Sequence, residues 1–427
     1  MYDIKSENKK ERVLIVGVEI DKRAEIDIES SMKELCELVE AADGIVEGSV
    51  TQNRERIDSA FYIGKGKAQE VANYCDELNI DTVVFNNELT GAQTRNLEDI
   101  INRKIVDRTN LILDIFAKRA TSKEGKLQVE LAQLRYRLPR LIGLGNQLSR
   151  TGGGIGTRGP GEKKLETDRR HILERIHDIE KQMKELENVR MVKRKKRQGS
   201  DTPIVALVGY TNAGKSTLLN RLIKFDEGYS EDKEVFVYDM LFATLETTLR
   251  KSVLPNGQDF LITDTVGFVS KLPTKLVEAF KGTLEEVEYA DLLLHVVDVT
   301  NKDLDLQIKT TLSVLKDLDV LDKPIITVFN KIDESNEEII YDIAEPKVFV
   351  SAKNGDNIDL LLETIQNNLP QKYYKVKMLI PYSEGNLASN IFSKTKVENC
   401  EYNEEGTLLT TVLDSIEYER YKKYLID

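Results

Sequence analysis

Short apolar runs alternate with stretches of helical periodicity over roughly the first 110 residues of the chain. The runs that read as strands are Val13–Ile20, Ile45–Val50, Thr82–Phe85 and Lys104–Asp107. The stretches whose apolar residues recur at helical spacing are Glu29–Ala42, Lys67–Leu78 and Gly91–Asn102. Strands that alternate with helices in this way predict a parallel α/β sheet.

The pattern then changes to two long stripes at heptad-like spacing. The first stripe consists of Leu127, Leu131, Leu134, Leu138 and Leu141, and the second of Ile172, Ile176, Ile179, Met183 and Leu186. Such stripes predict two long helices packed antiparallel, with the apolar residues forming their common core. Between them lies Arg150–Gly161, whose six glycines and Pro160 are expected to interrupt the helices. This loop is either a passive connector or a functional segment with exposed backbone N–H groups.

A second α/β pattern follows, and then a shorter mixed segment. In the last segment, Lys375–Pro381 and Leu408–Leu413 read as strands, and Asn386–Ser393 and Ile416–Leu425 as helices. The predicted fold class is therefore α/β, with a small α+β unit at the end. The expected division is an N-terminal α/β domain (1–110), a helical hairpin (111–195), a linker (196–201), a central domain (202–370) and a C-terminal domain (371–427).

Charge is distributed unevenly along the chain. The net charge is −12, yet residues 121–200 hold 20 Lys and Arg against 10 Asp and Glu, a local net of +10. A basic segment in an acidic protein indicates either a face for a polyanion or an ordinary solvated helix surface. If the face binds RNA, the candidate contacts are Arg150, Arg158, Lys163 and Lys164.

Composition excludes several classes of protein. The three cysteines are far apart in sequence and there are only three histidines, which argues against a disulfide scaffold and a His-rich metal site. No apolar run approaches the length of about 18 residues that spans a bilayer. The charged start of the chain and the short apolar run after it do not resemble a secretory signal, so we expect a cytoplasmic protein.

The strongest chemical signal is the segment Gly209-Tyr-Thr-Asn-Ala-Gly-Lys-Ser216. It follows the apolar run Ile204–Val208 and leads into an apolar helical stretch, which is the context that a phosphate-binding loop requires. Backbone N–H groups and the helix N-terminus surround phosphate oxygens in such a loop. Lys215 would reach the β and γ phosphates, and the Ser216 hydroxyl would bind Mg²⁺. The sequence therefore predicts nucleotide binding.

Two later motifs extend this site. Asp264-Thr-Val-Gly267 follows a strand-like run and has the pattern D-x-x-G. In this pattern the Asp lies near Mg²⁺ and the Gly N–H contacts the γ-phosphate. Just before it, Pro255-Asn-Gly257 is typical of a hairpin turn, so one edge of the sheet should be antiparallel.

The identity of the base is indicated by Asn330-Lys-Ile-Asp333. A carboxylate at Asp333 accepts hydrogen bonds from guanine N1–H and the N2 amino group, whereas adenine offers neither donor. Lys331 would lie along the base plane, and the Ala352 N–H of Ser351-Ala-Lys353 would donate to guanine O6. The expected ligand is GTP rather than ATP.

These ordered elements resemble the translation-factor-related P-loop GTPases, and more narrowly the HflX family of ribosome-associated GTPases. The narrower resemblance is carried by Tyr62-Ile-Gly-Lys-Gly-Lys67, Val106-Asp-Arg-Thr109, Gly125-Lys-Leu-Gln-Val-Glu-Leu-Ala-Gln133, Gly153-Gly-Ile-Gly-Thr-Arg-Gly-Pro-Gly-Glu162 and Phe242-Ala-Thr-Leu245. It covers most of residues 10–370. It implies an N-terminal α/β domain with a helical hairpin, a central GTPase domain and binding to the large ribosomal subunit, in splitting, rescue or assembly.

The motifs and the resemblance together give the candidate site. Its nucleotide-binding residues are Gly209, Tyr210, Thr211, Asn212, Ala213, Gly214, Lys215, Ser216, Phe242, Ala243, Thr244, Leu245, Glu246, Asp264, Thr265, Val266, Gly267, Asn330, Lys331, Ile332, Asp333, Ser351, Ala352 and Lys353. Lys215 and Thr244 are the catalytic candidates, and Ser216 and Thr244 the Mg²⁺ ligands. The resemblance implies that Thr244 is the switch threonine, although Thr247 and Thr248 are local alternatives.

The source of catalysis is less evident from the sequence. Phe268 follows the D-x-x-G glycine, where many GTPases carry a glutamine that orients water, so intrinsic hydrolysis should be slow. One hypothesis is that the Asn212 side-chain oxygen binds a K⁺ ion beside the phosphates, and the alternative is that ribosomal RNA or protein completes the site.

The sequence is also compatible with two other functions. The protein would be a GTP-dependent adaptor if its acidic surfaces bound a protein partner without RNA contact. A second nucleotide site in the N-terminal domain, built on Gly64-Lys-Gly-Lys67, is the weaker alternative, because that segment lacks the phosphate-loop pattern and a β-turn explains it. We expect a monomer.

Overall fold

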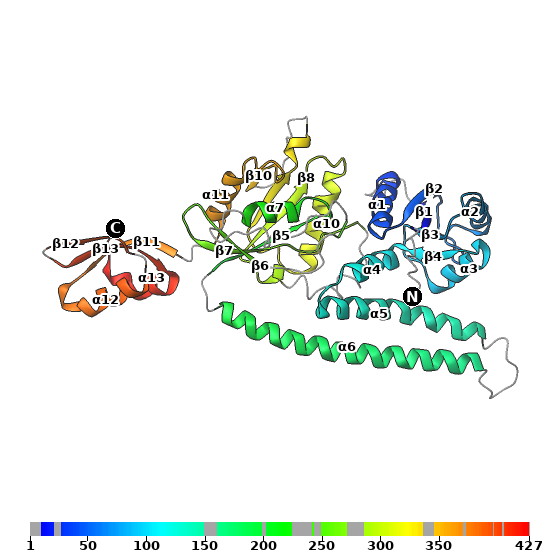
Figure 1. Cartoon of the computed structure of the whole chain (residues 1–427), viewed down its shortest axis with the longest axis horizontal. Coiled ribbons are helices and arrows are strands. Elements are labelled where there is room, and N and C mark those ends of the chain that lie inside the picture. The colour runs from blue at the N-terminus through cyan, green and yellow to red at the C-terminus, as the bar shows by residue number, and fades with distance from the viewer. Residues whose placement is uncertain are drawn as a thin grey trace, which may run out of the picture.

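The computed structural model contains three separate β-sheets joined by helices (Figure 1). It describes residues 10–20, 27–148, 160–198, 202–223, 241–242, 249–270, 286–335, 346–369, 373–395, 397–403 and 405–426. Within these ranges, no helix is both long enough and apolar enough to cross a membrane.

The first sheet is parallel and covered on both faces. Its strands lie in the order β2-β1-β3-β4 and comprise β1 (Arg12–Glu19), β2 (Ile45–Asn53), β3 (Thr82–Phe85) and β4 (Lys104–Asp107). Its helices are α1 (Ile28–Ala41), α2 (Lys65–Glu77), α3 (Gly91–Ile101) and α4 (Arg108–Arg119). The six central residues of β1 are all buried, as expected for a strand with helices on both sides. The parallel sheet predicted from the alternating pattern is confirmed.

Helix α4 belongs to the first sheet and not to the helical segment after it. The Asp107 carboxylate accepts a hydrogen bond from Asn110 N (2.9 Å) and caps the helix where β4 ends. Ile112 and Phe116 of α4 share a buried apolar cluster with Ile15 of β1. The first α/β unit therefore extends past Arg119, beyond the end at residue 110 that the sequence suggested.

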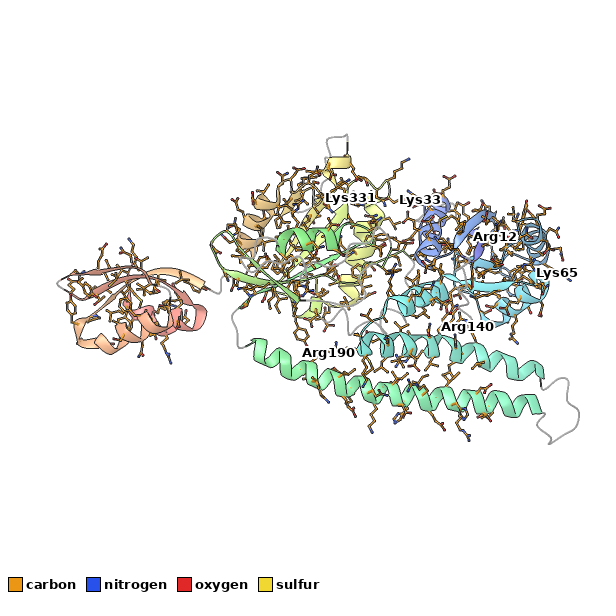
Figure 2. The ribbon with its side chains drawn as sticks, in the orientation of Figure 1. Arg12, Lys33, Lys65, Arg140, Arg190 and Lys331 are labelled. Carbon is orange, nitrogen blue, oxygen red and sulfur yellow. The ribbon has the colours of Figure 1, made fainter. Side chains whose placement is uncertain are left out.

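Two long helices follow, α5 (Lys123–Leu148) and α6 (Pro160–Gln198). They run antiparallel around a core of Leu127, Leu131, Ile176 and Ile179, and ion pairs such as Arg175–Glu130 (2.7 Å) flank that core. Arg190, labelled in Figure 2, pairs near the other end of α6 with Glu124 of α5 (2.9 Å).

The ends of α6 differ from the sequence-based expectation. Pro160 and Gly161 were assigned to the loop, but α6 begins at Pro160, a position where proline fits because its missing N–H has no partner in a first turn. The helix then continues to Gln198, so residues 196–198 are helical and the predicted linker 196–201 is wrong over that part.

The second sheet has six strands in the order β10-β9-β8-β5-β7-β6. They are β5 (Ile204–Gly209), β6 (Leu249–Val253), β7 (Asp259–Thr263), β8 (Leu292–Asp298), β9 (Ile325–Asn330) and β10 (Lys347–Phe349). Only β6 pairs antiparallel, through a hairpin in which Gly257 has φ 82°, as the Pro-Asn-Gly turn predicted. The helices are α7 (Lys215–Ile223), α10 (Leu304–Asp317), α11 (Ile358–Asn368) and the short η2 (Ile332–Glu334).

The third sheet is antiparallel and has the order β12-β13-β11-β14. Its strands are β11 (Tyr373–Ile380), β12 (Val397–Tyr402), β13 (Thr407–Asp414) and β14 (Leu425–Ile426). The helices are α12 (Gly385–Lys394) and α13 (Ser415–Tyr421), with short turns η3 (Tyr382–Glu384) and η4 (Lys422–Tyr424). The sequence predicted only two of these strands, and the helix expected over 416–425 ends at Tyr421.

Candidate functional site

The phosphate-binding loop connects the central strand β5 to helix α7. Gly209 has φ 149°, and an added Cβ there would lie 2.2 Å from the carbonyl oxygen of Val296. Gly214 has φ 88°, and its added Cβ would lie 2.2 Å from Nδ2 of Asn330. Both positions need glycine, because a side chain would collide with a neighbouring strand and with the base-recognition motif.

Lys215 is buried at the start of α7, with its ammonium turned back onto the loop. Its Nζ donates to the carbonyl oxygens of Gly209 (3.1 Å) and Tyr210 (2.7 Å). Burial lowers the pKa of Lys215 to about 8, and the nearby Asp264 carboxylate opposes that shift. The cation therefore lies among the loop carbonyls, at the position where phosphate oxygens would offer it a better partner.

Ser216 and Asp264 lie together at the same end of the second sheet. The Ser216 hydroxyl donates to Oδ2 of Asp264 (2.5 Å), and the Asp264 side chain is fully buried. A hydroxyl and a carboxylate are hard oxygen ligands of the kind that Mg²⁺ prefers. The pair thus fits a magnesium ion that bridges the protein and a nucleoside triphosphate.

The D-x-x-G glycine lies directly against the phosphate-binding loop. A Cβ added to Gly267 would be 2.7 Å from Cγ2 of Thr211 and 2.9 Å from Nζ of Lys215. The next residue, Phe268, is 2% exposed and packs in an apolar cluster, so its side chain cannot orient a water molecule. Thr265 is buried, and its hydroxyl donates to the carbonyl oxygen of Leu207 in β5 (2.6 Å).

Asn330 joins the base-recognition motif to the phosphate-binding loop. Its Nδ2 donates to the Ala213 carbonyl (2.9 Å), and its Oδ1 accepts from the Ala352 N–H (3.0 Å). Donation from Ala352 to guanine O6 therefore requires that this hydrogen bond be shared or exchanged. Lys331 adopts φ 67° and forms an ion pair with Asp298 at the end of β8 (2.7 Å).

The remaining base-side candidates surround the same end of the sheet. Ile332 and Asp333 lie on η2, where Asp333 is exposed and free to face a ligand. Ser351 is buried, and its hydroxyl accepts from the N–H of Asn354 (3.0 Å). The side chain of Arg221 in α7 donates to the carbonyl of Lys353 and so ties this loop to the phosphate-binding helix.

The segment around the predicted switch threonine is described only at residues 241–242. Ala243, Thr244, Leu245 and Glu246 lie outside the described residues, so the role of Thr244 stays a prediction. Phe242 has φ 55° and is 2% exposed. Its ring packs edge-to-face on Phe116 of α4, with centroids 4.6 Å apart. The side chain of Phe242 therefore packs against the first α/β unit and not into the nucleotide site.

A cavity of about 570 Å³ borders the phosphate-binding loop and is closed on one side by helix α1. Its lining includes Asn212 and Lys331 from the second sheet and Ser30 and Glu34 from α1. The α1 residues were not predictable from the sequence, because no local pattern links a helix near residue 30 to a loop near residue 210.

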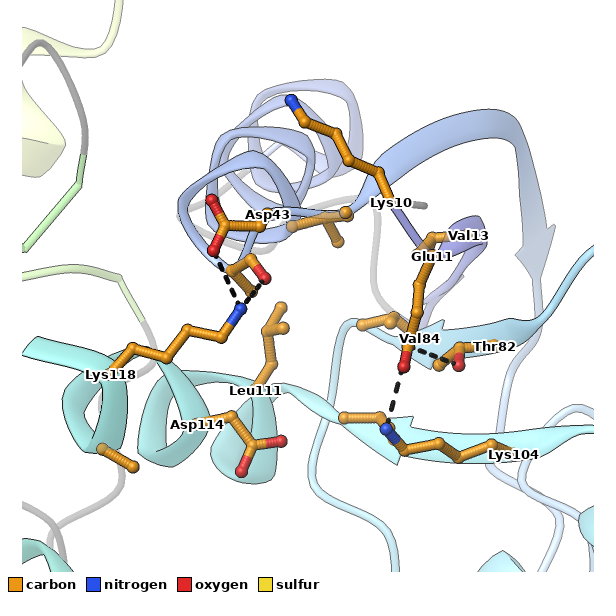
Figure 3. Close-up of a pocket in the computed structure, with 15 residues that line it drawn as sticks. Lys10, Glu11, Val13, Asp43, Thr82, Val84, Lys104, Leu111, Asp114 and Lys118 are labelled. Carbon is orange, nitrogen blue, oxygen red and sulfur yellow. Dashed lines mark hydrogen bonds and ion pairs between the residues drawn. The ribbon is translucent and has the colours of Figure 1, made fainter. Parts of the chain in front are cut away.

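A second cavity, of about 620 Å³, lies at the amino ends of β1, β3 and β4 in the first unit (Figure 3). Its charged residues are partly paired with one another, as in Lys118 with Asp43 (2.9 Å) and Lys104 with Glu11 (3.8 Å). The lining does not include Gly64–Lys67, which instead begins helix α2. The cavity thus lends no support to a nucleotide site built on that segment.

Of the RNA-contact candidates, Arg150 and Arg158 lie outside the described residues. Lys163 and Lys164 lie in the first turns of α6. Over the ranges that the structure describes, no three His, Cys, Asp or Glu residues are grouped to hold a metal ion.

Known proteins resemble this chain over most of its length. Three family models match consecutive parts of the chain: "GTP-binding GTPase N-terminal" over residues 29–117, "GTP-binding GTPase Middle Region" over 119–197 and "50S ribosome-binding GTPase" over 204–331. A solved GTP-binding protein from Sulfolobus solfataricus in complex with GDP is 26% identical, with a TM-score of 0.44 over 84% of this chain and 98% of that one.

Two similar proteins are both named "GTPase HflX". The protein "GTPase HflX" of Caldanaerobacter subterraneus is 50% identical over 417 residues, covering 98% of this chain and 94% of that protein. The protein of the same name from Escherichia coli K12 is 40% identical over 364 residues, or 84% of each chain. P-loop GTPases generally use Mg²⁺ with GTP, in keeping with the Ser216–Asp264 pair. The chain binds and hydrolyses GTP and belongs to the HflX family of GTPases.

Proposed function

We propose that the protein binds the large ribosomal subunit in its GTP state and acts in the cytoplasm in ribosome splitting, rescue or assembly. The observation that carries this proposal is the basic helix pair attached to the GTPase. Residues 121–200 carry a net charge of +10, whereas the rest of the chain carries −22. With 39 residues, α6 is about 58 Å long, enough to project far from the nucleotide site.

The parts of the molecule would divide this work. The helical hairpin within 111–195 is the arm that contacts RNA, and Arg150, Arg158, Lys163 and Lys164 are its candidate phosphate contacts. The central domain, 202–370, supplies the switch, and the C-terminal domain, 371–427, is a separate unit without assigned chemistry. The family model matched over residues 204–331 is described as a 50S ribosome-binding GTPase, which supports the choice of partner.

Within the nucleotide site, each motif would have one task. Lys215 would neutralise the β and γ phosphates, while Ser216 and Thr244 would hold Mg²⁺, which would supply further positive charge to the triphosphate. Asp333 accepts the two guanine donors, so an adenine base would leave its carboxylate without partners. A γ-phosphate held between Lys215 and Gly267 would displace Gly267, and that displacement would report that GTP is bound.

Potassium is the proposed substitute for the missing glutamine. Asn212 has φ 61° and belongs to the phosphate-binding loop, where its side-chain oxygen would bind K⁺ beside the phosphates. We expect faster GTP hydrolysis in KCl than in NaCl of equal ionic strength, and no such difference in Asn212→Ala. Equal rates of phosphate release from the unmodified protein in the two salts would remove this role.

Salt dependence separates RNA contact from the competing adaptor function. If four basic side chains contact phosphates, the logarithm of the binding constant should fall against that of the salt concentration with a slope of about −3 to −4. An interface with a protein partner would give a much shallower slope.

A matched pair of double variants tests where those contacts lie. Lys163→Ala with Lys164→Ala should reduce the slope by about 1 to 2. Lys422→Ala with Lys423→Ala removes two exposed lysines from the C-terminal unit and should leave the slope unchanged. Equal effects of the two double variants would contradict contact through the hairpin.

A further inference from the structure

A charged cluster lies buried between the first α/β unit and the GTPase unit. Arg108, the first residue of α4, is 2% exposed and forms an ion pair with Glu34 of α1. Its Nη2 also donates to the carbonyl oxygen (3.1 Å) and the hydroxyl (3.2 Å) of Ser270, three residues beyond the D-x-x-G glycine. Its Nη1 donates to Oδ1 of Asn86 (3.0 Å). One guanidinium thus contacts both units.

Glu34 makes the matching contacts to the phosphate-binding loop. The Tyr210 hydroxyl donates to one of its carboxylate oxygens, and Ser270 donates to the carboxylate through its N–H (3.1 Å) and its hydroxyl. The Ser270 N–H also lies 2.6 Å from the Tyr210 hydroxyl oxygen. A single carboxylate of the first unit therefore connects the second residue of the phosphate-binding loop with the segment after Gly267.

Apolar side chains cover one side of this cluster, and on the other side Glu34 and Ser270 line the cavity of about 570 Å³. Phe242, Val266 and Val269 of the GTPase unit share one buried apolar cluster with Ile112 and Phe116 of α4. In Figure 1, α1 and α4 lie on the side of the first sheet that faces the GTPase sheet. Charges held in such a place interact strongly, and removal of one partner leaves the other buried and uncompensated.

The same chain segment also reaches the helical hairpin. Asp107, the neighbour of Arg108, accepts a hydrogen bond from Arg140 of α5 (3.1 Å) and another from the N–H of Leu89 (2.9 Å). Two adjacent side chains at the end of β4 therefore hold α5 on one side and the GTPase on the other. This gives a physical role to the Val106-Asp-Arg-Thr109 segment, which the nucleotide site does not use.

We propose that Glu34 and Arg108 are positioning residues that set the preference of the GTPase between GDP and GTP. They hold Ser270 and Tyr210 in the arrangement where Gly267 packs against Lys215. A γ-phosphate has to lie between Lys215 and Gly267, so GTP displaces the D-x-x-G loop and with it Ser270. The contacts from Glu34 and Arg108 oppose that displacement, and by reciprocity a bound triphosphate weakens them.

The test compares nucleotide affinities in full-length variants. Tyr210→Phe preserves the buried ring and removes only the hydroxyl, and Glu34→Gln preserves the shape and removes the charge. Each variant should shift the ratio of GDP affinity to the affinity for a non-hydrolysable GTP analogue towards the triphosphate, by about 5- to 100-fold. Glu40→Gln on the exposed face of α1 is the matched control and should leave the ratio unchanged.

A second measurement distinguishes positioning from simple structural support. Amide hydrogen exchange in α1 and at the start of α4 should be faster with the GTP analogue than with GDP in the unmodified protein, and equal with the two nucleotides in Tyr210→Phe. The proposal is overturned if Tyr210→Phe and Glu34→Gln fold as the unmodified protein does, yet keep its affinity ratio within twofold. It is equally overturned if exchange in α1 and α4 does not depend on the nucleotide.

Discussion

Asn330 shows how one side chain can organise a nucleotide site. It accepts a hydrogen bond from the Ala352 N–H and donates one to the Ala213 carbonyl, so it fixes the loop for the base to the loop for the phosphates. Gly214 allows this contact, since any larger residue would occupy the space of the Asn330 amide. The two motifs are more than 100 residues apart in sequence and act as one unit.

Guanine selectivity should depend on Asp333. Replacement by Asn leaves one amide oxygen to accept from guanine N1–H and places an amide donor opposite the N2 amino group. We expect Asp333→Asn to weaken GDP binding by at least about 100-fold, because one hydrogen bond becomes a donor–donor contact and the other loses its charged acceptor. Calorimetric titration should also show a gain for xanthosine diphosphate, whose C2 carbonyl accepts from the new amide. Unchanged GDP affinity would contradict the assignment of Asp333.

His295 gives the GTPase unit a sensitivity to acid. It is 2% exposed on β8, and its Nε2 has no hydrogen-bond partner within the part of the chain that the structure describes. Burial lowers the pKa of His295 to about 4, and the charge of Lys215 adds to this effect. The folded protein therefore holds this imidazole neutral at a pH where an unfolded chain would protonate it.

A pH series can measure this effect. Because the folded pKa lies below the unfolded one, the contribution of His295 to stability is complete above pH 6.5 and decreases towards pH 4. The loss should be about 1.4 kcal/mol at pH 5.5. His295→Leu should lack this component, so denaturant unfolding of the GTPase unit should depend less on pH between 7.5 and 5.5. An identical pH dependence in both proteins would argue against a buried neutral imidazole.

Individual residues of the nucleotide site were predictable because their motifs are short and local. The chain order of the glycines, Lys215, Asp264 and Asn330 specifies one chemistry, and the structure brings these residues together at one end of the second sheet. Glu34 and Arg108 carried no such signal. An acidic residue on an amphipathic helix and an arginine at a helix start are ordinary surface residues in sequence, and only tertiary packing buries them.

At the scale of elements, the helix pair α5 and α6 follows directly from its apolar stripes. The predicted residues Leu127, Leu131, Ile176 and Ile179 form the buried core between the helices. The helix ends were not predictable from the same pattern, because a backbone helix can continue through polar residues to Gln198 and can begin at Pro160. The expected division also placed residues 111–119 with the helical hairpin, whereas they belong to α4, whose packing on the first sheet depends on tertiary contacts.

The core of the helix pair should depend strongly on Ile179, which is completely buried. Ile179→Ala leaves a cavity and should cost about 2–4 kcal/mol of local stability. Hydrogen exchange in α5 and α6 should become faster, while GTP affinity stays the same. The exposed neighbour Val189→Ala serves as the control, because its side chain is 54% exposed and contributes little packing. Equal protection of the helices in the two variants would mean that the stripe is not their core.

At the scale of the whole molecule, the contacts of the first unit connect its other parts. Asp107 holds Arg140 of the hairpin, Arg108 holds Ser270 of the GTPase, and the two side chains are adjacent in the chain. These contacts connect the segment after Gly267 with helix α5, which is part of the hairpin proposed to bind RNA. Figure 1 shows the third sheet at the far end of the GTPase sheet, away from this route.

The sequence indicated an α/β fold but not the contacts between its units. Tyr210 and Glu34 are 176 positions apart, and no sequence pattern around either residue indicates that the two side chains are in contact. The uneven charge along the chain and the family resemblance were the sequence features that pointed to a macromolecular partner.

Co-sedimentation with separated ribosomal subunits directly tests whether the protein binds the large subunit in its GTP state. Purified protein is loaded with GDP or with a non-hydrolysable GTP analogue and centrifuged with large or small subunits at fixed salt. We expect the analogue-bound protein to pellet with large subunits at least about tenfold more strongly than the GDP-bound protein, in line with an allosteric coupling of about 1–3 kcal/mol. Equal pelleting with both nucleotides, or no preference for the large subunit, would contradict it.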